Sequence, residues 1–461
     1  MDNFYGRTSE LSEIYKVLDR TKQQNILIYG RRRIGKSFLI RKAIEKYDCK
    51  KIFYQCKNIS IEKTIEQLTE TVRQTFNNKF ISFHDIEEAF DFIFSQNDVI
   101  FVLDEYSFLQ QRVEGLDSII QQKIDEYKFS SNIKLIISGS AIDIMRKIVD
   151  YDNPLFGRFN LVINLKEHNY LESSLYYKLY SNEDKVLLYS VFGGEPYYNS
   201  LIDPTKTVVE NIIELAIKEN SQLEMNIMAT IKNEISKIAC ANEVLTAIAL
   251  GRKKNNEIAT FAYVDSASMN NALKKLISLD IVEKVKPINV VGDKKALYSI
   301  KSNSIRFYYR YVYMLTGERD SMNARSFFDK FVANDFKTQF VPKVFEDVAK
   351  QFLIQRNKIG LMDPLFSRIG TYYFDDSKNK KNGQFDVVTL DENGYIFYEV
   401  KFTNDPIGTS VLNEEIKQLA NLGLNYYKLG FISKTGSTLE PEKYNLFSLA
   451  DIYALQTVIK E

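Results

Sequence analysis

A glycine-rich basic loop lies between two segments of opposite character at residues 25–47. The segment NILIY before it has the length and composition of a buried strand, and SFLIRKAIEKY after it has helical spacing of apolar residues. The loop itself, GRRRIGKS, fits the pattern G-x-x-x-x-G-K-[ST], with its fixed positions at Gly30, Gly35, Lys36 and Ser37. A strand, such a loop and a helix in this order predict a parallel-sheet α/β domain that binds phosphate.

The residue types of this loop suit a nucleoside triphosphate. Gly30 and Gly35 let the backbone wrap closely around phosphates, and the helix that follows points its positive end at the anion. We expect the ammonium of Lys36 to reach the β- and γ-phosphates and the hydroxyl of Ser37 to coordinate Mg²⁺. A strand-to-helix turn that binds nothing is the alternative. The predicted cofactors are ATP and Mg²⁺, and the predicted cofactor-binding residues are Gly30, Arg31, Arg32, Arg33, Ile34, Gly35, Lys36, Ser37 and Phe38.

An acidic pair at the end of a second strand supplies the next element that nucleotide hydrolysis needs. The segment VIFVLDE ends in Asp104 and Glu105. We expect Asp104 to hold the hydration shell of Mg²⁺ and Glu105 to polarise the attacking water. An acidic helix cap after a core strand is the alternative. A third strand, IKLIISGS, ends in Ser138 and Ser140, which are candidates to sense the γ-phosphate, although a strand ending in Ser-Gly-Ser also suits an ordinary turn.

The bulk composition limits the other classes of function. A length of 461 residues predicts about three or four domains, and a net charge of +1 indicates no overall field that would attract nucleic acid or a membrane, which leaves a local basic surface open. Three cysteines and two distant histidines argue against a disulfide framework, a zinc site or a histidine triad. With no basic-then-apolar leader and no run of roughly 20 apolar residues, we expect a cytoplasmic protein without a membrane partner.

The order of these motifs resembles a known family. Residues 4–10, FYGRTSE, are similar to the F-x-G-R-x-x-E opening of AAA-type and signal-transducing (STAND-like) NTPases, and GRRRIGKS, LDE, ISGS and PLFGR follow as in a group of prokaryotic, archaeal-type P-loop ATPases with a nuclease-like C-terminal domain. The resemblance covers essentially the whole chain. It implies that residues 4–10 lie near the adenine and that Arg158 is an arginine finger or sensor, in its own chain or from a neighbouring subunit. A surface arginine is the alternative.

GGEPYY, at residues 193–198, resembles the glycine-proline element that such ATPases place against the nucleotide from a helical lid. Gly194 and Pro196 also suit an ordinary helix break.

The middle of the chain changes from helical spacing to a mixed pattern. Residues 166–238 predict a helical lid on the nucleotide core, whereas residues 239–302 show three helical segments and then two strands joined at Gly292-Asp293, the order of a winged helix. In DNA-binding winged helices the third helix enters the major groove and the wing contacts the backbone. A lid or a protein-binding module is the alternative. The residues placed for DNA contact would be Asn270, Asn271, Lys274 and Lys275 on the helix and Lys294 and Lys295 on the wing.

The segment SIRFYYRYVYM alternates aromatic and basic residues, with arginines at Arg306 and Arg310. Such a pattern could stack on bases. A helix that packs two domains together is the alternative that we favour.

The C-terminal third has the pattern of a metal-dependent nuclease. QFDVVTL and YIFYEVKF read as a hairpin that carries Asp386 on one strand and Glu399 and Lys401 on the next. This arrangement resembles the PD-(D/E)xK core, in which carboxylates bind Mg²⁺ and the lysine orients the attacking water. Glu346, on the preceding helix, would be a further ligand. Gln384 stands where many relatives have an acid, so an inactive nucleic-acid-binding remnant is the alternative.

We therefore expect a multidomain α/β ATPase. Its nucleotide state would control binding to a nucleic acid, with DNA the leading candidate, or to a protein partner. A homo-oligomer is possible. A nucleotide-switched interaction module that cuts nothing is the competing hypothesis. The expected domains are a P-loop ATPase core at 1–165, a helical lid at 166–238, a winged helix at 239–302 and a restriction-endonuclease-like α/β domain at 303–461. The predicted catalytic residues are Lys36, Asp104, Glu105, Arg158, Asp386, Glu399 and Lys401, and the predicted metal ligands are Ser37, Asp104, Glu346, Asp386 and Glu399.

Overall fold

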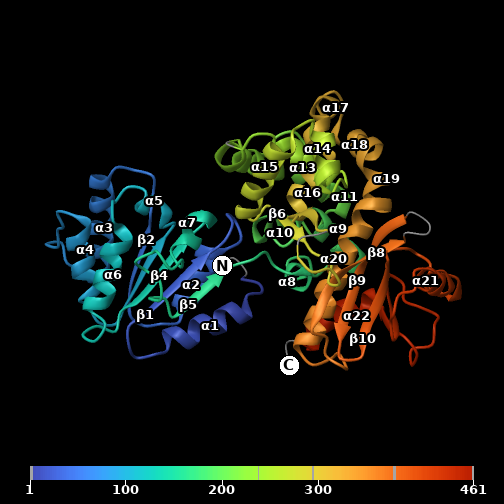
Figure 1. The fold of residues 1–461 in the computed structure, drawn as a ribbon. Coiled ribbons are helices and arrows are strands. Elements are labelled where there is room, and N and C mark those ends of the chain that lie inside the picture. Colours follow the sequence, from blue (N-terminus) through green and yellow to red (C-terminus); the bar gives the residue numbers. More distant parts are fainter. Residues whose placement is uncertain (1–3, 237, 293–294, 377–380, 459–461) are drawn as a thin grey trace. The chain divides into compact units, whose positions relative to one another are not determined.

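The structure is a computed structural model that describes residues 4–236, 238–292, 295–376 and 381–458 (Figure 1). The chain divides into two compact units, Met1–His168 and Asn169–Glu461, and each is described by itself. The turn residue Asp293 and the predicted wing residue Lys294 lie outside the described residues.

In residues 4–168, all of which the structure describes, five parallel strands form one sheet in the order β2-β3-β4-β1-β5. The strands are β1 (Gln24–Tyr29), β2 (Lys50–Gln55), β3 (Val99–Asp104), β4 (Lys134–Gly139) and β5 (Leu161–Asn164). The helices are α1 (Thr8–Leu18), α2 (Lys36–Glu45), α3 (Ile61–Phe76), α4 (Ile86–Phe94), α5 (Ser107–Gln110), α6 (Leu116–Glu126) and α7 (Ile142–Lys147). The parallel α/β core predicted from the sequence is confirmed.

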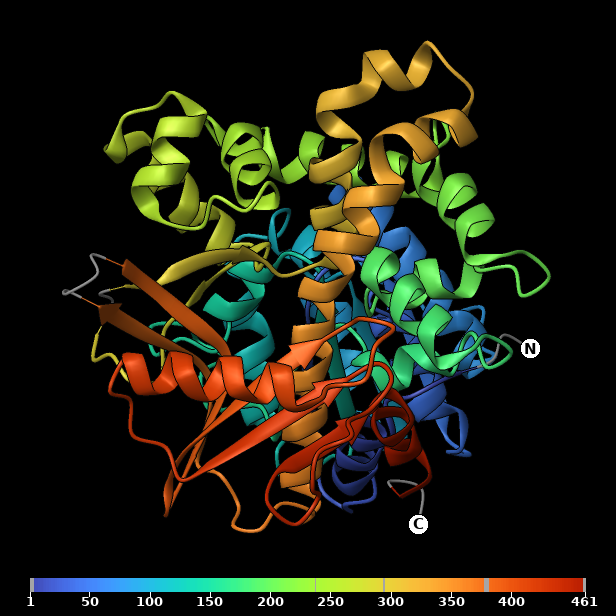
Figure 2. The same cartoon turned by 90° about the vertical axis from the view of Figure 1, so that its right-hand side faces the viewer.

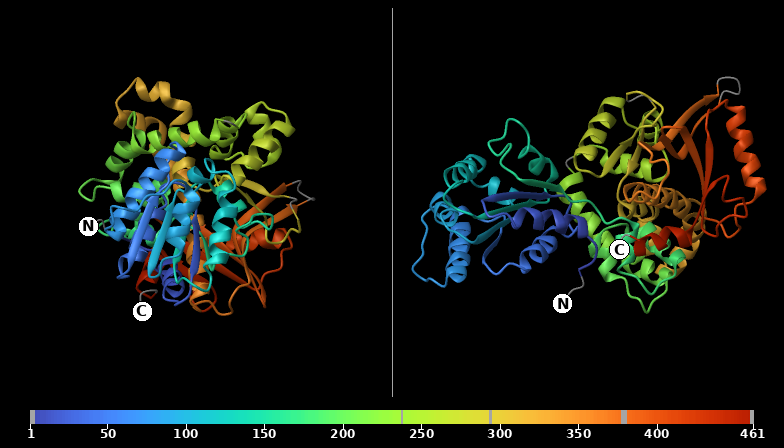
Figure 3. Two further views of the ribbon diagram at one scale, coloured as in Figure 1. Left: turned by 90° about the vertical axis from the view of Figure 1, so that its left-hand side faces the viewer. Right: turned by 90° about the horizontal axis from the view of Figure 1, so that it is seen from below.

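Both faces of this sheet are covered by helices (Figures 1 and 3). In β1, Ile26 and Ile28 belong to an apolar cluster with residues of α1 and α2, whereas Leu27 and Tyr29 belong to a cluster with residues of α3, α4 and α6. Successive side chains of a strand point to opposite faces, so a strand buried on both faces is apolar throughout. This explains why NILIY shows no polar–apolar alternation.

Helices form the first part of the second unit. They are α8 (Tyr170–Ser174), α9 (Asn182–Phe192), α10 (Pro196–Leu201), α11 (Val208–Ile212), the π-helical turn Ile213–Ile217, α12 (Gln222–Thr230) and the π-helical turn Ile231–Ile235. Their apolar side chains join a large core cluster that extends into the C-terminal helices.

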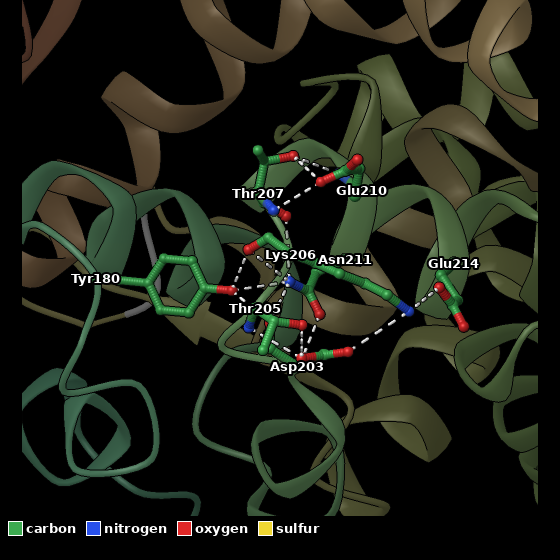
Figure 4. A network of polar contacts seen from close by, with 8 residues as sticks. All are labelled: Tyr180, Asp203, Thr205, Lys206, Thr207, Glu210, Asn211 and Glu214. Atoms are coloured by element: carbon green, nitrogen blue, oxygen red, sulfur yellow. Dashed lines mark hydrogen bonds and ion pairs between the residues drawn. The ribbon is translucent and has the colours of Figure 1, made fainter.

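The loop between α10 and α11 is fixed by the side chain of Asn211, which is 1% exposed (Figure 4). Its amide nitrogen donates hydrogen bonds to the hydroxyl of Tyr180, to Asp203 O and to Thr207 O, while its carbonyl oxygen accepts from Asp203 N at 2.8 Å. Thr207 caps α11 in a capping box with Glu210. The donors and acceptors that Figure 4 labels satisfy one another, so this network serves the fold.

Three helices and a two-stranded antiparallel sheet follow: α13 (Ala241–Ala249), α14 (Asn255–Ala262), α15 (Ser266–Ser278), β6 (Val282–Val285) and β7 (Leu297–Ile300). The connection between β6 and β7 contacts a strand of the C-terminal sheet, β8 (Arg368–Asp376). Ile288 N donates to Thr371 O at 2.8 Å, and Asn289 exchanges two hydrogen bonds with the backbone of Tyr373. This connection is therefore attached to the last part of the chain.

A further group of helices leads to the C-terminal sheet. It comprises α16 (Asn303–Tyr311), a 3-10 turn (Tyr313–Leu315), α17 (Thr316–Asp320), α18 (Ala324–Phe327), the π-helical turn Phe328–Val332, α19 (Ala333–Asp335), the π-helical turn Phe336–Phe340 and α20 (Val341–Lys358). In its described residues, the mixed sheet has the order β12-β11-β10-β9-β8. Its other elements are β9 (Lys381–Asp391), β10 (Gly394–Lys401), α21 (Thr409–Asn421), β11 (Lys428–Ser433), β12 (Asn445–Ser448) and α22 (Leu449–Val458).

The C-terminal sheet has α20 and α22 on one face and α21 on the other (Figures 1 and 2). Ile396 and Tyr398 of β10 belong to the core cluster that contains α20, whereas Phe397 belongs to a cluster with Leu412 and Leu419 of α21. Neighbouring residues of this strand therefore face different helices.

No helix within the described ranges is both long enough and apolar enough to cross a membrane. Cys49, Cys56 and Cys240 are free thiols.

We expect Asn211→Ala to destabilise the second unit by about 2 kcal/mol, because several buried backbone groups lose their hydrogen-bond partner. Hydrogen–deuterium exchange should show faster exchange in residues 202–212. Lys206→Ala is the control, since it removes only the partly exposed ion pairs with Glu214 and Asp203 and should change stability by less than about 1 kcal/mol. Equal protection in both variants would contradict the structural role of Asn211.

Candidate nucleotide-binding site and C-terminal carboxylates

The loop after β1 has a backbone that only certain residues tolerate. Gly30 has φ +155°, and a Cβ atom built on it would lie 2.3 Å from Leu165 O and 2.5 Å from a methyl carbon of Ile34. Gly35 and Arg33 also have positive φ values, +90° and +67°. The glycine at position 30 is thus required by close backbone approach as well as by conformation.

The ammonium of Lys36 is directed into the loop. It donates hydrogen bonds to Gly30 O at 3.0 Å and to Arg31 O at 2.9 Å, and the residue is 5% exposed. Arg31 also pairs with Glu167 at 3.2 Å. A phosphate that entered the loop would compete with these two carbonyl oxygens for the ammonium, since a charged acceptor forms the stronger hydrogen bond.

The two acidic positions lie at the carboxyl end of β3, beside the loop. Ser37 Oγ donates to Asp104 Oδ2 at 2.7 Å, and Ser138 Oγ of β4 donates to Asp104 Oδ1 at 2.5 Å. Asp104 is 1% exposed. Mg²⁺ is usually held by one or two oxygen ligands of the protein together with phosphates and waters. The hydroxyl and carboxylate here fit that donor set.

Glu105 has a left-handed backbone with φ +56°, which is uncommon for a residue with a side chain. Its carboxylate accepts hydrogen bonds from Ser140 Oγ at 2.5 Å and from Ser140 N at 3.2 Å. The acids at the end of β3 are therefore each held by a serine at the end of β4. A strained conformation that neighbouring groups maintain is a frequent property of functional residues.

Two features near the loop were not predicted from the sequence in this detail. Arg7, which is 4% exposed, donates to Ile34 O at 3.1 Å, to Lys166 O at 2.5 Å and to Glu10 at 3.1 Å. It thereby ties α1 and the segment after β5 to the phosphate loop. The ring of Phe4 stacks on that of Phe38 with centroids 5.6 Å apart, and Phe38 is 41% exposed. The motif F-x-G-R-x-x-E contained both signals.

Arg158 is not brought to the phosphate loop of its own chain. Its carbonyl accepts from Asn25 Nδ2 at 2.9 Å, at the amino end of β1, and its guanidinium pairs with Asp125 at 3.0 Å. The loop begins at the opposite end of β1, and a strand rises about 3.3 Å per residue, so roughly 15 Å separates the two ends. The predicted finger role within one chain does not fit this position.

The glycine-proline element lies in the second unit. Gly193 has φ +57°, Gly194 follows it, and Pro196 is the first residue of α10. Glu195 between them is buried and accepts hydrogen bonds from Ser302 and Ser304. These contacts fix a helix start, and a role beside the nucleotide stays a prediction.

The residues predicted to contact DNA differ in their exposure to solvent. Asn271, Lys274 and Lys275 of α15 are exposed, while Asn270 is half-buried and its side chain accepts from Asn255. Lys295 is exposed, and its ammonium lies 4.7 Å from the ring centroid of Tyr373.

The aromatic-basic segment is a buried helix. Arg310 of α16 donates to both carboxylate oxygens of Asp335, and Arg306 pairs with Asp347 at 3.3 Å. Phe307 and Tyr308 are buried. These arginines connect α16 to α19 and α20, and the packing of two domains by this helix stays a prediction.

Asp386 and Glu346 share one lysine on the α20 face of the C-terminal sheet. Lys343 Nζ lies 2.6 Å from Asp386 and 2.7 Å from Glu346, and Gln384 donates to Asp386 at 2.9 Å. Burial and the nearby charge of Asp386 raise the pKa of Glu346 to about 7. Burial alone would raise the pKa of Asp386, but the ammonium of Lys343 lowers it below its ordinary value.

Glu399 and Lys401 form a pair at 2.6 Å on β10. The hydrogen bond with Glu399 raises the pKa of Lys401 above its ordinary value. Beside them lies Glu415 of α21, which is 8% exposed. Burial, and then the charge of Glu399, raise the pKa of Glu415 to about 7. Sequence reasoning missed Glu415, although it lies on the apolar side of an amphipathic helix.

The two pairs lie on different faces of the sheet. Between Gly370 and Tyr372 the pairing of β8 with β9 shifts, so that Thr371 faces both Asp386 and Val387. This bulge directs Asp386 towards α20, whereas Glu399 follows Phe397 on the α21 face. Among the residues that the structure describes, no group of three or more His, Cys, Asp or Glu side chains is placed to hold a metal ion. The structure thus brings Glu346 to Asp386 and Glu399 to Lys401, but does not join the pairs.

Two regions of the chain match known families. Residues 4–201 match a family described as an ATPase domain predominantly from Archaea. Together with the loop and the acidic strand end described above, this match decides the nature of the first part. The chain contains an archaeal-type P-loop ATPase domain. Residues 308–418 match a family described as archaeal and bacterial proteins of unknown function.

One relative aligns with most of the chain. The chain is 29% identical over 404 residues to an uncharacterised protein of Methanocaldococcus jannaschii, with 87% of each chain covered. Among solved structures, the Walker-type ATPase PABY2304 of Pyrococcus abyssi is 18% identical with a TM-score of 0.49, covering 66% of this chain and 96% of that one. The ORC2 protein of Aeropyrum pernix, in ADPNP and ADP complexes, is 12% identical with a TM-score of 0.49, covering 70% and 97%.

The raised pKa of Glu415 predicts a pH dependence of stability. The unfolded chain loses this proton near pH 4.5 and the folded protein near pH 7, so the unfolded state binds fewer protons between these values and stability falls as pH rises. We expect Glu415→Gln to be about 2 kcal/mol more stable than the wild type at pH 8 and nearly equal to it at pH 5. Chemical denaturation at the two pH values measures the difference. A difference that does not change with pH would contradict this prediction.

Proposed function

We propose that the first unit binds ATP with Mg²⁺ and hydrolyses it. The observation that carries the proposal is the 2.7 Å hydrogen bond from Ser37 to Asp104, which joins the phosphate loop to the acidic strand end at the place where a magnesium ion would sit. The loop conformation at Gly30 and Gly35 and the buried ammonium of Lys36 support it. Bound Mg²⁺ would offset phosphate charge and orient the triphosphate.

Each residue has a separate task in this proposal. Lys36 exchanges its two carbonyl acceptors for phosphate oxygens, and its charge stabilises the triphosphate. Ser37 and Asp104 hold the metal and its waters. Glu105 orients and polarises the attacking water, and Ser140, which donates two hydrogen bonds to its carboxylate, holds it in place. The stacked rings of Phe4 and Phe38 are the candidate contact for the adenine.

A second copy of the chain is the proposed source of the arginine that completes the site. Arg158 lies at the amino end of β1, which is the end opposite to the phosphate loop. It is partly exposed, and among the described residues its carboxylate partner is Asp125. An arginine finger supplied in trans is common among P-loop enzymes. This proposal makes hydrolysis dependent on protein concentration.

The second unit is proposed to respond to the nucleotide state and to bind a nucleic acid, with DNA the leading candidate, or a protein. The order α13, α14, α15, β6 and β7 supports a winged helix, and the exposed Lys274 and Lys275 support nucleic-acid contact. The β6–β7 connection is attached to β8, which favours a fixed interaction module over a free wing. The helix–strand–strand–strand–helix–strand order from α20 to β11 supports a nuclease-like fold for the C-terminal part.

The arrangement of carboxylates favours binding without cleavage. Asp386 faces Lys343 of α20, whereas Glu399 faces α21. A metal-dependent nuclease needs its carboxylates and its lysine around one phosphate. We therefore prefer the proposal of a nucleotide-dependent interaction module with an inactive nuclease-like domain over that of an endonuclease.

We expect Glu105→Gln to bind ATP with Mg²⁺ normally but to hydrolyse it about 10²–10³-fold more slowly, because the water loses its polarising carboxylate. Lys36→Ala should lose binding of labelled ATP. Steady-state phosphate release and filter binding give the two readouts. Lys63→Ala, on the exposed surface of α3, is the matched control and should behave as wild type. Wild-type hydrolysis by Lys36→Ala would refute the ATPase proposal.

Incubation of supercoiled plasmid with Mg²⁺ or Mn²⁺ tests the C-terminal proposal. We expect equal, background nicking by the wild type and by Glu399→Ala and Asp386→Ala, because the two carboxylates do not share a site. A metal-dependent activity of the wild type that either substitution abolishes would establish a nuclease and overturn the preferred proposal.

A further inference from the structure

A cavity of about 590 Å³ lies within the second unit, away from the phosphate loop. One wall is the polar side of α20, a second is the hairpin of β6 and β7 with the end of α13, and a third is the bulge between β8 and β9. The hydrogen bonds from Ile288 and Asn289 to β8 join the second and third walls. The volume lies within the range of about 300–1,000 Å³ that is usual for small-ligand sites.

Two polar groups that line this cavity, one buried and one half-buried, have no side-chain partner among the described residues. Thr371 is 4% exposed, and its hydroxyl has no hydrogen-bond partner among the described residues. A buried hydroxyl without a partner costs roughly 1–3 kcal/mol. Thr371 lies opposite the bulge at Asp386, and both residues line the cavity. A ligand oxygen in the cavity would give this hydroxyl an acceptor.

The second unpartnered group is the ammonium of Lys253. The residue lines the cavity, and no ion pair joins it to any carboxylate in the described ranges of the chain. Burial, together with the nearby ammonium of Lys343, lowers the pKa of Lys253 to about 8. The charges of Asp386 and Asp347 oppose this shift, but both carboxylates are paired with other cations. An anion in the cavity would give the ammonium of Lys253 a partner of its own.

Six cationic and four acidic side chains line this cavity. Lys343 and Lys350 project from α20 and Arg306 from α16. The carboxylates between them are already paired, because Asp386 contacts Lys343 and Asp347 contacts both Arg306 and Lys350. Neither Lys253 nor the lining residue Glu283 has an ion-pair partner among the described residues. The cationic side chains on these walls still exceed the carboxylates, six to four.

The lining also has an apolar part, most of which lies near the β6–β7 hairpin. It is made by Leu250, Val285, Leu297 and Phe340. A bare inorganic anion would leave this surface uncovered. A ligand that fills the cavity therefore needs an anionic end for Lys253 and Thr371 and a flat or apolar part for the hairpin.

We propose that this cavity binds a small organic phosphate of mononucleotide size. Its phosphate accepts hydrogen bonds from Lys253 and Thr371, and its organic part lies against the β6–β7 hairpin. Ligand binding at this place joins the helix–hairpin module to the C-terminal sheet, since residues of both line the cavity. The proposal does not depend on ATP hydrolysis by the first unit.

Binding of AMP to the full-length Lys36→Ala protein tests this proposal, because that background impairs the phosphate loop. We expect equilibrium dialysis to show saturable AMP binding that Lys253→Met and Thr371→Val each weaken at least tenfold. Lys417→Met, on the exposed side of α21, is the matched control and should bind like the background protein. Absence of AMP binding at millimolar concentration, or binding that neither substitution changes, would refute the site.

Two further ligands distinguish the source of the phosphate. Inorganic phosphate should bind more weakly than AMP, and equal affinity would overturn the assignment of an organic ligand. A 5′-phosphorylated oligonucleotide that binds through Lys253 while AMP does not would overturn the small-molecule assignment in favour of nucleic acid.

The melting temperature of each variant shows whether weaker AMP binding results from a lost contact or from a less stable fold. Thr371→Val keeps the shape of the side chain and removes an unpartnered hydroxyl, so we expect its stability without ligand to be equal to or higher than that of the background. Weaker AMP binding together with a lower melting temperature would count against a direct contact.

Discussion

The bond between Ser37 and Asp104 is the contact on which the geometry of the first unit depends. It joins the helix after β1 to the end of β3, although β4 lies between these strands, and Ser138 at the end of β4 completes the bridge. A carboxylate that is 1% exposed is costly unless its oxygens accept hydrogen bonds. The hydroxyl groups of Ser37 and Ser138 meet that need. The protein's own side chains therefore fix the position of Asp104.

The residues of this site could be predicted from the sequence because they belong to short local motifs. The loop, the acidic strand end and the serines are each short motifs at strand ends, and a parallel sheet brings the carboxyl ends of its strands to one edge. Arg7 was harder to predict because its acceptors, Ile34 O and Lys166 O, are backbone atoms far along the chain. The position of Arg158 could not be predicted from the order of the motifs. A residue that lies next to a strand in the sequence can be at either end of the sheet.

In the second unit, elements were easier to predict than the positions of side chains. The helix α20 and the hairpin of β9 and β10 follow the sequence pattern, since turn residues and strand alternation are local signals. Val387 faces α20 and Val388 faces α21, so strict alternation back from these two residues would have placed Asp386 on the α21 face, with Glu399 and Lys401. The bulge opposite Thr371 breaks that alternation, and no residue type in QFDVV signals it. One shifted residue therefore separates a catalytic pattern into two structural pairs.

The charged side chains of the second unit differ in whether they have a partner, and this difference indicates where a ligand could bind. Lys343, Asp386 and Glu346 satisfy one another, as do Glu399 and Lys401, so each group has an adequate structural explanation. A paired charge gives little reason to expect a ligand, because its desolvation is already compensated. The ammonium of Lys253 and the buried hydroxyl of Thr371 are different. They have no partner in the described parts of the fold, so their desolvation lowers stability and no interaction within the fold offsets it. Their position around one cavity makes a bound anion the simplest physical reason for retaining both.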